Sequence, residues 1–126
     1  ERLRSITRRN RGVSFERVLS ELRSFQTGWL HYFRYAACRS RMQETDGWLR
    51  HKLRCYRLKQ CKRTKAIRDF LHRNGVSNDN AWILAASGKG WWRLAGCPQA
   101  HEAMNLQWFK EQGVKSLVHQ YDELQR

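Results

Sequence analysis

A long basic amphipathic helix, expected between about residues 41 and 61, limits the folds open to this chain. Its less polar side chains recur every three or four residues, which places them along one face of an α-helix. Lys and Arg occupy both flanks of that face, because 3.6 residues complete one turn. Such a helix has to bury its ridge against other helices. The ridge is Met42, Thr45, Leu49, Leu53 and Tyr56, one flank is Arg50, Arg54 and Arg57, and the other is Arg41, Lys52 and Lys59.

The positive charge is concentrated in the first half of the chain. The net charge is +14, and residues 1–65 carry 18 Lys and Arg against 5 Asp and Glu, whereas residues 66–126 carry 7 against 6. A charge run is commonly just a solvated surface. Here few carboxylates can pair with the cations, so like charges four residues apart repel one another. The asymmetry therefore favours a binding face for phosphate groups.

Further helical patterns precede the basic helix. A short basic helix is expected to end near residues 10–12, and Ser14 is a typical N-cap for the helix that follows. A stripe facing the core continues from there to Ala36 at spacings of three and four. Gly28 lies inside this pattern, where glycine costs about 1 kcal/mol relative to alanine. We therefore expect a kink, a break near Ser24, or a close approach by another backbone.

The second half also has helical spacing. Helices are expected over residues 66–74, capped by Thr64, and then over 77–86, 98–111 and 116–124, with Pro98 at the first helical position. No stretch alternates with a period of two. The sequence thus predicts an all-α fold, a small bundle of about six or seven helices. We expect a strongly basic region at residues 1–65 and a C-terminal extension at 66–126 that packs on it.

Residues 88–93, GKGWWR, are expected to form a loop in which aromatic rings stand beside cations. Such a combination is typical of platforms on which nucleic-acid bases stack. The alternative is that Trp91 and Trp92 pack the second half of the chain onto the core, and this is slightly favoured for at least one of them.

The sequence offers no convincing catalytic or metal site. The carboxylates are scattered, and neither a phosphate-binding GxxxxGK[ST] loop nor an HExxH motif is present. Zinc ligands are conceivable among His51, Cys55, Cys61, Cys97 and His101, but six residues separate the two helical cysteines and place them about 120° apart. We expect no cofactor, no metal and no enzyme activity from this fragment. No apolar run reaches the roughly 20 residues of a membrane span, and a cytoplasmic location is expected.

Four segments carry a resemblance to a known family: ITRRNRG at 6–12, GWLHYFRYA at 28–36, DGWLRHKLRCYRLKQCKRTK at 46–65 and KGWWRLAGCP at 89–98. Together they resemble the C-terminal maturase, or thumb (X), region of bacterial group II intron reverse transcriptases. The order and spacing of these segments carry the likeness, because each one alone is weak. The chain starts at Glu1 within a helical pattern, so we expect it to be a piece of a longer protein.

The resemblance implies a helical domain that binds group II intron RNA, promotes splicing and grips the RNA template with its DNA primer. It also implies an N-terminal polymerase domain in the same parent chain, an RNA-directed DNA polymerase. A free-standing helical protein that binds DNA is the alternative. Residues carried over as architectural are Gly28, Trp29, Tyr32, Phe33, Trp48 and Leu53. The expected RNA-binding residues are Arg34, Arg39, Arg41, Arg50, Lys52, Arg54, Arg57, Lys59, Lys62, Arg63, Lys65, Lys89 and Arg93.

Overall fold

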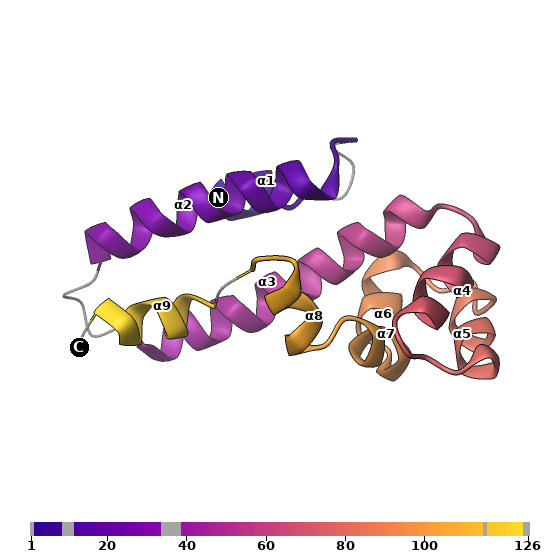
Figure 1. Cartoon of the computed structure of the whole chain (residues 1–126). Helices are drawn as coiled ribbons and strands as arrows, with labels where there is room; N and C mark the ends of the chain where they lie inside the picture. Colours follow the sequence, from indigo (N-terminus) through magenta and orange to yellow (C-terminus); the bar gives the residue numbers. More distant parts are fainter. Residues whose placement is uncertain (1, 9–11, 34–38, 115, 125–126) are drawn as a thin grey trace.

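Helix α3 (Arg39–Cys61) is the longest element of the computed structural model, which describes residues 2–8, 12–33, 39–114 and 116–124 (Figure 1). No strand occurs in those residues, so the predicted all-α fold is confirmed. The other helices of the described part are α1 (Arg2–Ile6), α2 (Phe15–Phe33), α4 (Thr64–Arg73), α5 (Asn78–Ala85), α6 (Trp91–Ala95), α7 (Pro98–Ala103), α8 (Leu106–Glu111) and α9 (Leu117–Leu124).

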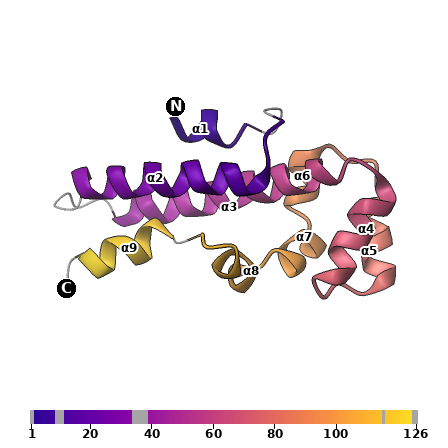
Figure 2. The same ribbon diagram turned by 45° about the horizontal axis from the view of Figure 1, so that its top comes forward.

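Helix α3 forms the axis around which the other helices are placed. Helix α2 runs antiparallel beside it, and α1 lies on one side of this pair while α8 and α9 lie on the other (Figures 1 and 2). Helices α4 to α7 gather at the C-terminal end of α3. Helix α3 contacts α6, α9 and α4. No described helix has both the length and the apolar character needed to cross a bilayer.

The predicted ridge of α3 is buried. Met42, Leu49, Leu53 and Tyr56 are almost completely inaccessible to solvent. Leu49, Leu53 and Tyr56 belong to the main core, which also takes residues from α1, α2 and α4 to α8. Met42 packs in a separate small cluster with Leu30 of α2 and Leu117 of α9. The spacing of the ridge thus identified the buried face of this helix correctly.

Of the two predicted N-caps, Ser14 is confirmed and Thr64 is not. The hydroxyl of Ser14 accepts a hydrogen bond from the Arg17 N–H at 3.2 Å, and that of Ser77 accepts one from the Asn80 N–H at 3.3 Å. Thr64 does not cap α4, because it is already the first helical residue and Arg63 is the residue before it. Pro98 begins α7, as predicted.

Helix α2 corrects the expectation at Gly28. The helix continues through Ser24 and Gly28 without a break. A Cβ added at Gly28 would meet no atom within 4 Å, so no neighbouring backbone approaches closely there. The structure therefore gives no steric reason for glycine at this position.

The described residues form more helices than the expected six or seven. The predicted loop at 88–93 ends at Gly90, and Trp91, Trp92 and Arg93 form the start of α6. The single helix expected over 98–111 is two, α7 and α8. The side-chain oxygen of Asn105 accepts a hydrogen bond from the Trp108 N–H at 2.9 Å and so starts a new helix.

Candidate nucleic-acid interface

The flank of α3 that holds Arg50, Arg54 and Arg57 is largely covered by the second half of the chain. Arg54 is only 6% exposed, its Nε donates to the Met104 carbonyl at 2.9 Å, and its guanidinium lies 5.2 Å from the centre of the Phe109 ring. Burial lowers the pKa of Arg54 to about 10, and the positive charge of Arg50 acts in the same direction. Arg54 thus holds the segment after α7 against α3 and does not face solvent.

Arg57 is also drawn into the fold. Its guanidinium stands 4.2 Å from the centre of the Phe70 ring in α4, within the range of a cation–π contact. One guanidinium nitrogen is 3.6 Å from the Cys61 sulfur. The side chain is half-buried, and these two contacts hold its guanidinium against α4 and the end of α3.

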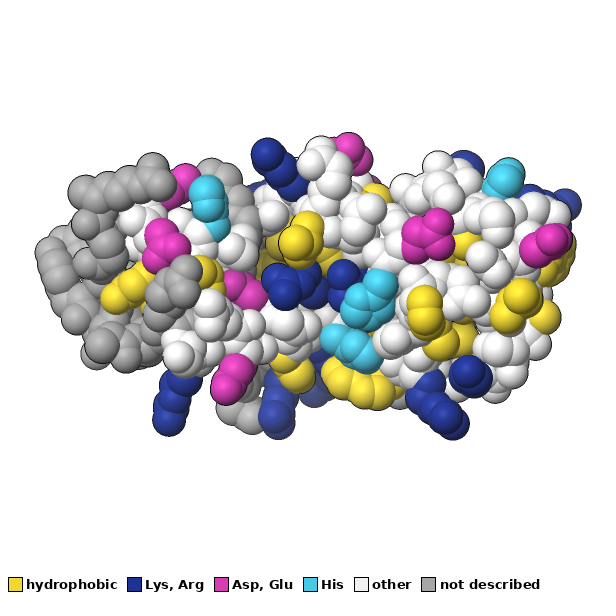
Figure 3. Space-filling model, turned by 90° about the horizontal axis from the view of Figure 1, so that it is seen from below, with side chains coloured by type: hydrophobic (Ala, Val, Ile, Leu, Met, Phe, Trp, Pro, Cys, Tyr) yellow, Lys and Arg dark blue, Asp and Glu magenta, His cyan; other side chains and the backbone are white. Residues whose placement is uncertain are grey.

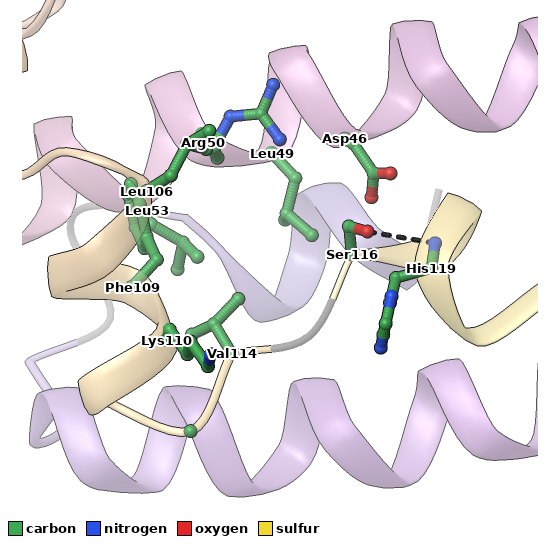
Figure 4. A pocket seen from close by; sticks show the side chains of 11 residues that line it. Asp46, Leu49, Arg50, Leu53, Leu106, Phe109, Lys110, Val114, Ser116 and His119 are labelled. Atoms are coloured by element: carbon green, nitrogen blue, oxygen red, sulfur yellow. Dashed lines mark hydrogen bonds between the residues drawn. The ribbon is translucent and has the colours of Figure 1, made fainter.

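Arg50 borders a cavity of about 590 Å³ between α3, α8 and α9, where apolar side chains make up much of the wall (Figure 4). The buried carboxylate of Asp46 accepts hydrogen bonds from the Leu117 N–H at 2.8 Å and the Val118 N–H at 3.1 Å. Burial raises the pKa of Asp46, although these two hydrogen bonds and Arg50 oppose the shift. Asp46 thereby ties the start of α9 to α3.

The other flank of α3 is open and faces α1. A hollow of about 410 Å³ lies between α1, α3 and α6, and none of the described residues that line it is acidic. The Lys52 ammonium is 5.7 Å from the centre of the Trp48 ring and 5.8 Å from that of Trp92. We call this site the basic hollow, and its lining residues are Arg4, Ser5, Arg8, Trp48, Lys52 and Trp92.

A second depression continues along the same side of α3. It is bordered by residues 12–14 from the connection to α2, and by Tyr56, Lys59, Gln60 and Lys62. Both depressions lie on one line of the helix, because Trp48, Lys52, Tyr56 and Lys59 are separated by four, four and three residues. The Tyr56 hydroxyl donates to the Val13 carbonyl at 2.6 Å and holds residues 12–14 against α3.

Five cations border these two depressions, and we call them the basic face: Arg4, Arg8, Lys52, Lys59 and Lys62. No described acidic side chain forms an ion pair within 4.0 Å with any of them. Arg4, Arg8 and Lys62 are exposed, and Lys52 and Lys59 are half-buried. These charges are therefore available to an anionic ligand.

Arg4 and Arg8 were not among the expected RNA-binding residues. For Arg4 the signal was present, because Leu3 and Ile6 form the apolar side of α1 and pack toward the core, and this spacing directs Arg4 away from it. Arg8 lies beyond the end of α1, so helical spacing does not place it. What the spacing did not indicate is that this side of α1 borders α3 and α6.

The two tryptophans of the GWW segment have different environments. Trp91 is half-buried and packs against the main core, whereas Trp92 is 44% exposed and borders the basic hollow. Among the residues carried over as architectural, Leu53 is fully buried and Trp29 half-buried, and Trp48 lines the hollow. The side chains of Tyr32 and Phe33 lie outside the described residues.

The remaining expected RNA-binding residues are spread over the molecule. Arg41, Arg63 and Lys65 are exposed on α3 and at the start of α4, and Arg93 is exposed on α6. Lys89 is exposed beside a different depression, which Cys97 and Pro98 also line. Arg34 and the side chain of Arg39 lie outside the described residues. Contact of these residues with RNA stays a prediction.

One face of the molecule carries a small group of Lys and Arg side chains. In the space-filling view from below, dark-blue side chains gather near the middle of the face, next to histidines and hydrophobic groups, while acidic side chains are dispersed (Figure 3). Burial lowers the pKa of His101, as do the charges of Arg54 and His51.

The residues considered as zinc ligands do not form a cluster. Within the described ranges, no three His, Cys, Asp or Glu side chains lie together as metal ligands do. Cys55 is buried, and Cys61 and Cys97 are half-buried. The His51 Nε2 lies 2.9 Å from the Trp92 carbonyl oxygen, and the two rings are in contact with centroids 3.8 Å apart.

Comparison with known proteins adds one match. The model of the family described as "Group II intron, maturase-specific domain" matches residues 1–75. No curated protein matches the chain. The matched segment contains α1 to α4, and therefore the whole basic face, whereas Trp92 lies beyond it.

Proposed function

Because the chain belongs to the group II intron maturase-specific domain family, we propose that it binds intron RNA through the basic face and so assists splicing. The matching family is a maturase-specific domain and not a catalytic one, so binding is the activity to account for. The observation that carries the proposal is the contrast between the two flanks of α3. One is packed against α4 and the segment after α7, and the other presents cations that no described carboxylate neutralises.

The proposed mechanism is recognition of phosphates and shape. Lys and Arg side chains that contact phosphates release bound counterions, so the affinity falls as the salt concentration rises. Double-stranded RNA presents a wide, shallow minor groove that proteins recognise mainly by shape and backbone contacts. Three positions on α3, Trp48, Lys52 and Lys59, line one edge suited to such a contact, and the buried Tyr56 supports the edge from inside.

A second part of the proposal concerns the parent protein. The resemblance of residues 6–12, 28–36, 46–65 and 89–98 to thumb regions supports a role in gripping the RNA template with its DNA primer. In that role the domain acts beside an N-terminal polymerase domain of the same parent chain. The same basic face serves both roles, because an RNA–DNA hybrid and a structured RNA both present two closely spaced phosphate backbones.

The test reverses two charges of the basic face. The double variant Lys52→Glu, Lys59→Glu is expected to bind a fully paired RNA hairpin about tenfold or more weakly, and to reduce the slope of log affinity against log salt by roughly one per lost contact. Fluorescence anisotropy at several salt concentrations measures both quantities.

Lys110→Glu is the control for the single variant Lys52→Glu, because each of these two variants changes the net charge by two. Lys110 is exposed on α8, which lies across the α2–α3 pair from α1 (Figures 1 and 2). Its reversal should change affinity much less, and equal losses in both variants would show that net charge, not the basic face, governs binding. In competition at fixed salt, a clear preference for duplex DNA over structured RNA would instead favour the alternative of a DNA-binding helical protein.

A further inference from the structure

Trp92 has an exposed aromatic ring, and His51 of α3 contacts it from the protein side. It is 44% exposed, yet its ring contacts that of His51 with centroids 3.8 Å apart, and its carbonyl oxygen lies 2.9 Å from the His51 Nε2. The backbone of α6 and a side chain of α3 therefore both fix the orientation of this ring. A ring that is held in place and still exposed is suited to stacking, because little conformational entropy is lost on contact.

The groups around Trp92 suit an anion. The Lys52 ammonium stands within 6 Å of the ring centres of both Trp92 and Trp48, and Arg4 of α1 and Arg8 just after it line the same hollow. None of the described residues that line the hollow is a carboxylate, so nothing among them neutralises the charge of a cationic ligand. An aromatic surface combined with several cations matches a nucleotide, which carries a flat base and a phosphate.

The ring also distinguishes paired from unpaired nucleotides. In a duplex both faces of each internal base are covered by neighbouring bases, so a tryptophan has no face on which to stack. Bulged, looped or terminal nucleotides expose their bases and are the usual targets of aromatic side chains in RNA recognition. The basic hollow therefore differs from the rest of the basic face, which suits paired RNA.

We propose that the basic hollow takes one unpaired nucleotide of the bound RNA, with its base stacked on Trp92 and its phosphates held by Arg4, Arg8 and Lys52. This inference rests on the proposed RNA-binding function and refines it. The site is composite, because Trp92 lies outside the family-matched residues 1–75 and the other lining residues lie within them. The segment after residue 75 thus adds recognition of an unpaired base to a surface that binds phosphates.

The experiment compares two RNA hairpins that differ by one bulged adenosine, each titrated with the 126-residue chain and with Trp92→Leu. The leucine keeps apolar contact with His51 but cannot stack. We expect Trp92→Leu to bind the bulged hairpin roughly 5- to 100-fold more weakly, as for loss of one stacked base, and to bind the paired hairpin as the wild type does. Trp92→Phe, which retains a ring, should recover most of the affinity for the bulged hairpin.

Trp82→Leu is the matched control. Trp82 is 39% exposed on α5 with the Arg68 guanidinium 5.2 Å from its ring centre, so its exposure and its cationic neighbour resemble those of Trp92. It does not line the basic hollow, and its replacement should leave the affinity for both hairpins unchanged. Circular dichroism establishes that each variant keeps its helices.

A further arm removes the bulged base and leaves its sugar and phosphate. If base and ring stack, this abasic hairpin should lose the same factor as Trp92→Leu, and the two changes together should cost little more than either alone. Additive losses, an unchanged affinity of Trp92→Leu for the bulged hairpin, or equal losses on both hairpins would overturn the nucleotide site while leaving the RNA-binding function intact. If the wild-type chain binds neither hairpin in a salt-dependent way, the proposed function fails first.

Discussion

Arg54 and Lys52 are two residues apart on α3 and have opposite surroundings. Arg54 donates to the Met104 carbonyl inside the fold, whereas the Lys52 ammonium stands in the open hollow between two tryptophan rings. Both have the charge expected of a phosphate-binding residue, so charge alone does not distinguish them. At the scale of the residue, the two side chains differ in their hydrogen bonding. Arg54 already donates to another part of the chain, whereas the Lys52 ammonium faces the hollow.

Arg54→Ala should therefore act on stability. It removes the donor for the Met104 carbonyl and the packing of the aliphatic stem, so we expect a loss of about 2 kcal/mol or more in the free energy of unfolding. The salt slope of RNA binding, measured where the variant is still folded, should stay the same. Urea denaturation and anisotropy titrations give the two values.

Lys52→Ala serves as the counterpart. It should change the free energy of unfolding by less than about 0.5 kcal/mol and lower the salt slope by roughly one. If Arg54→Ala instead leaves the urea midpoint unchanged and lowers the slope, Arg54 contacts RNA and the assignment to packing is wrong.

At the scale of the element, α2 is a continuous helix that contains a glycine with open space around it. Glycine inside a helix usually indicates a kink or a close neighbour, and neither occurs at Gly28. Gly75 is different, because it ends α4 with a φ of +97°, in the left-handed region where a Cβ is unfavourable. One of the two glycines is thus required by the backbone, and the other is not.

Gly28→Ala should stabilise the protein by about 1 kcal/mol, the difference in helix propensity between the two residues. Gly75→Ala is the control and should destabilise the protein by about 1 kcal/mol or more, because the left-handed backbone conformation is less favourable for alanine than for glycine. Thermal unfolding followed by circular dichroism measures both shifts. A lower melting temperature for Gly28→Ala would mean that the glycine is needed for a contact that the described residues do not show.

At the scale of the whole molecule, the core does not divide where the charge does. The expected boundary between residues 65 and 66 falls within the first turn of α4, and the family match ends at residue 75. The main core contains residues from both sides of either boundary, including Leu53 from α3 and Leu94 from α6. The C-terminal segment is therefore part of what keeps α3 folded.

A fragment of residues 1–75 should accordingly unfold without a cooperative transition in urea, whereas the 126-residue chain should unfold in a single step. The fragment lacks the partners that cover Arg54 and Leu53, so less surface is buried and the dependence of the unfolding free energy on urea should be shallower. Circular dichroism and tryptophan fluorescence follow the transition. A cooperative transition of the fragment at the midpoint of the whole chain would show that the first 75 residues form an independent domain.

The sequence by itself determined the features that depend on near neighbours. The spacing of Met42, Leu49, Leu53 and Tyr56 identified the buried ridge, and Ser14 was recognisable as a helix cap, because helix geometry relates residues only three or four positions apart. The resemblance to maturases was likewise carried by short segments, and the family match agrees with it. The exceptions, Thr64 and the division at Asn105, are helix ends, where several local hydrogen-bonding patterns compete.

Only the tertiary structure decided which flank of α3 stays open. That outcome depends on contacts between residues 40 to 71 positions apart, such as Lys52 with Trp92, Arg54 with Met104, and Asp46 with Leu117. Periodicity and composition treat the two flanks alike, because both carry three cations at helical spacing. The chain after residue 75 makes the two flanks different, because it packs against one of them and places α6 beside the other.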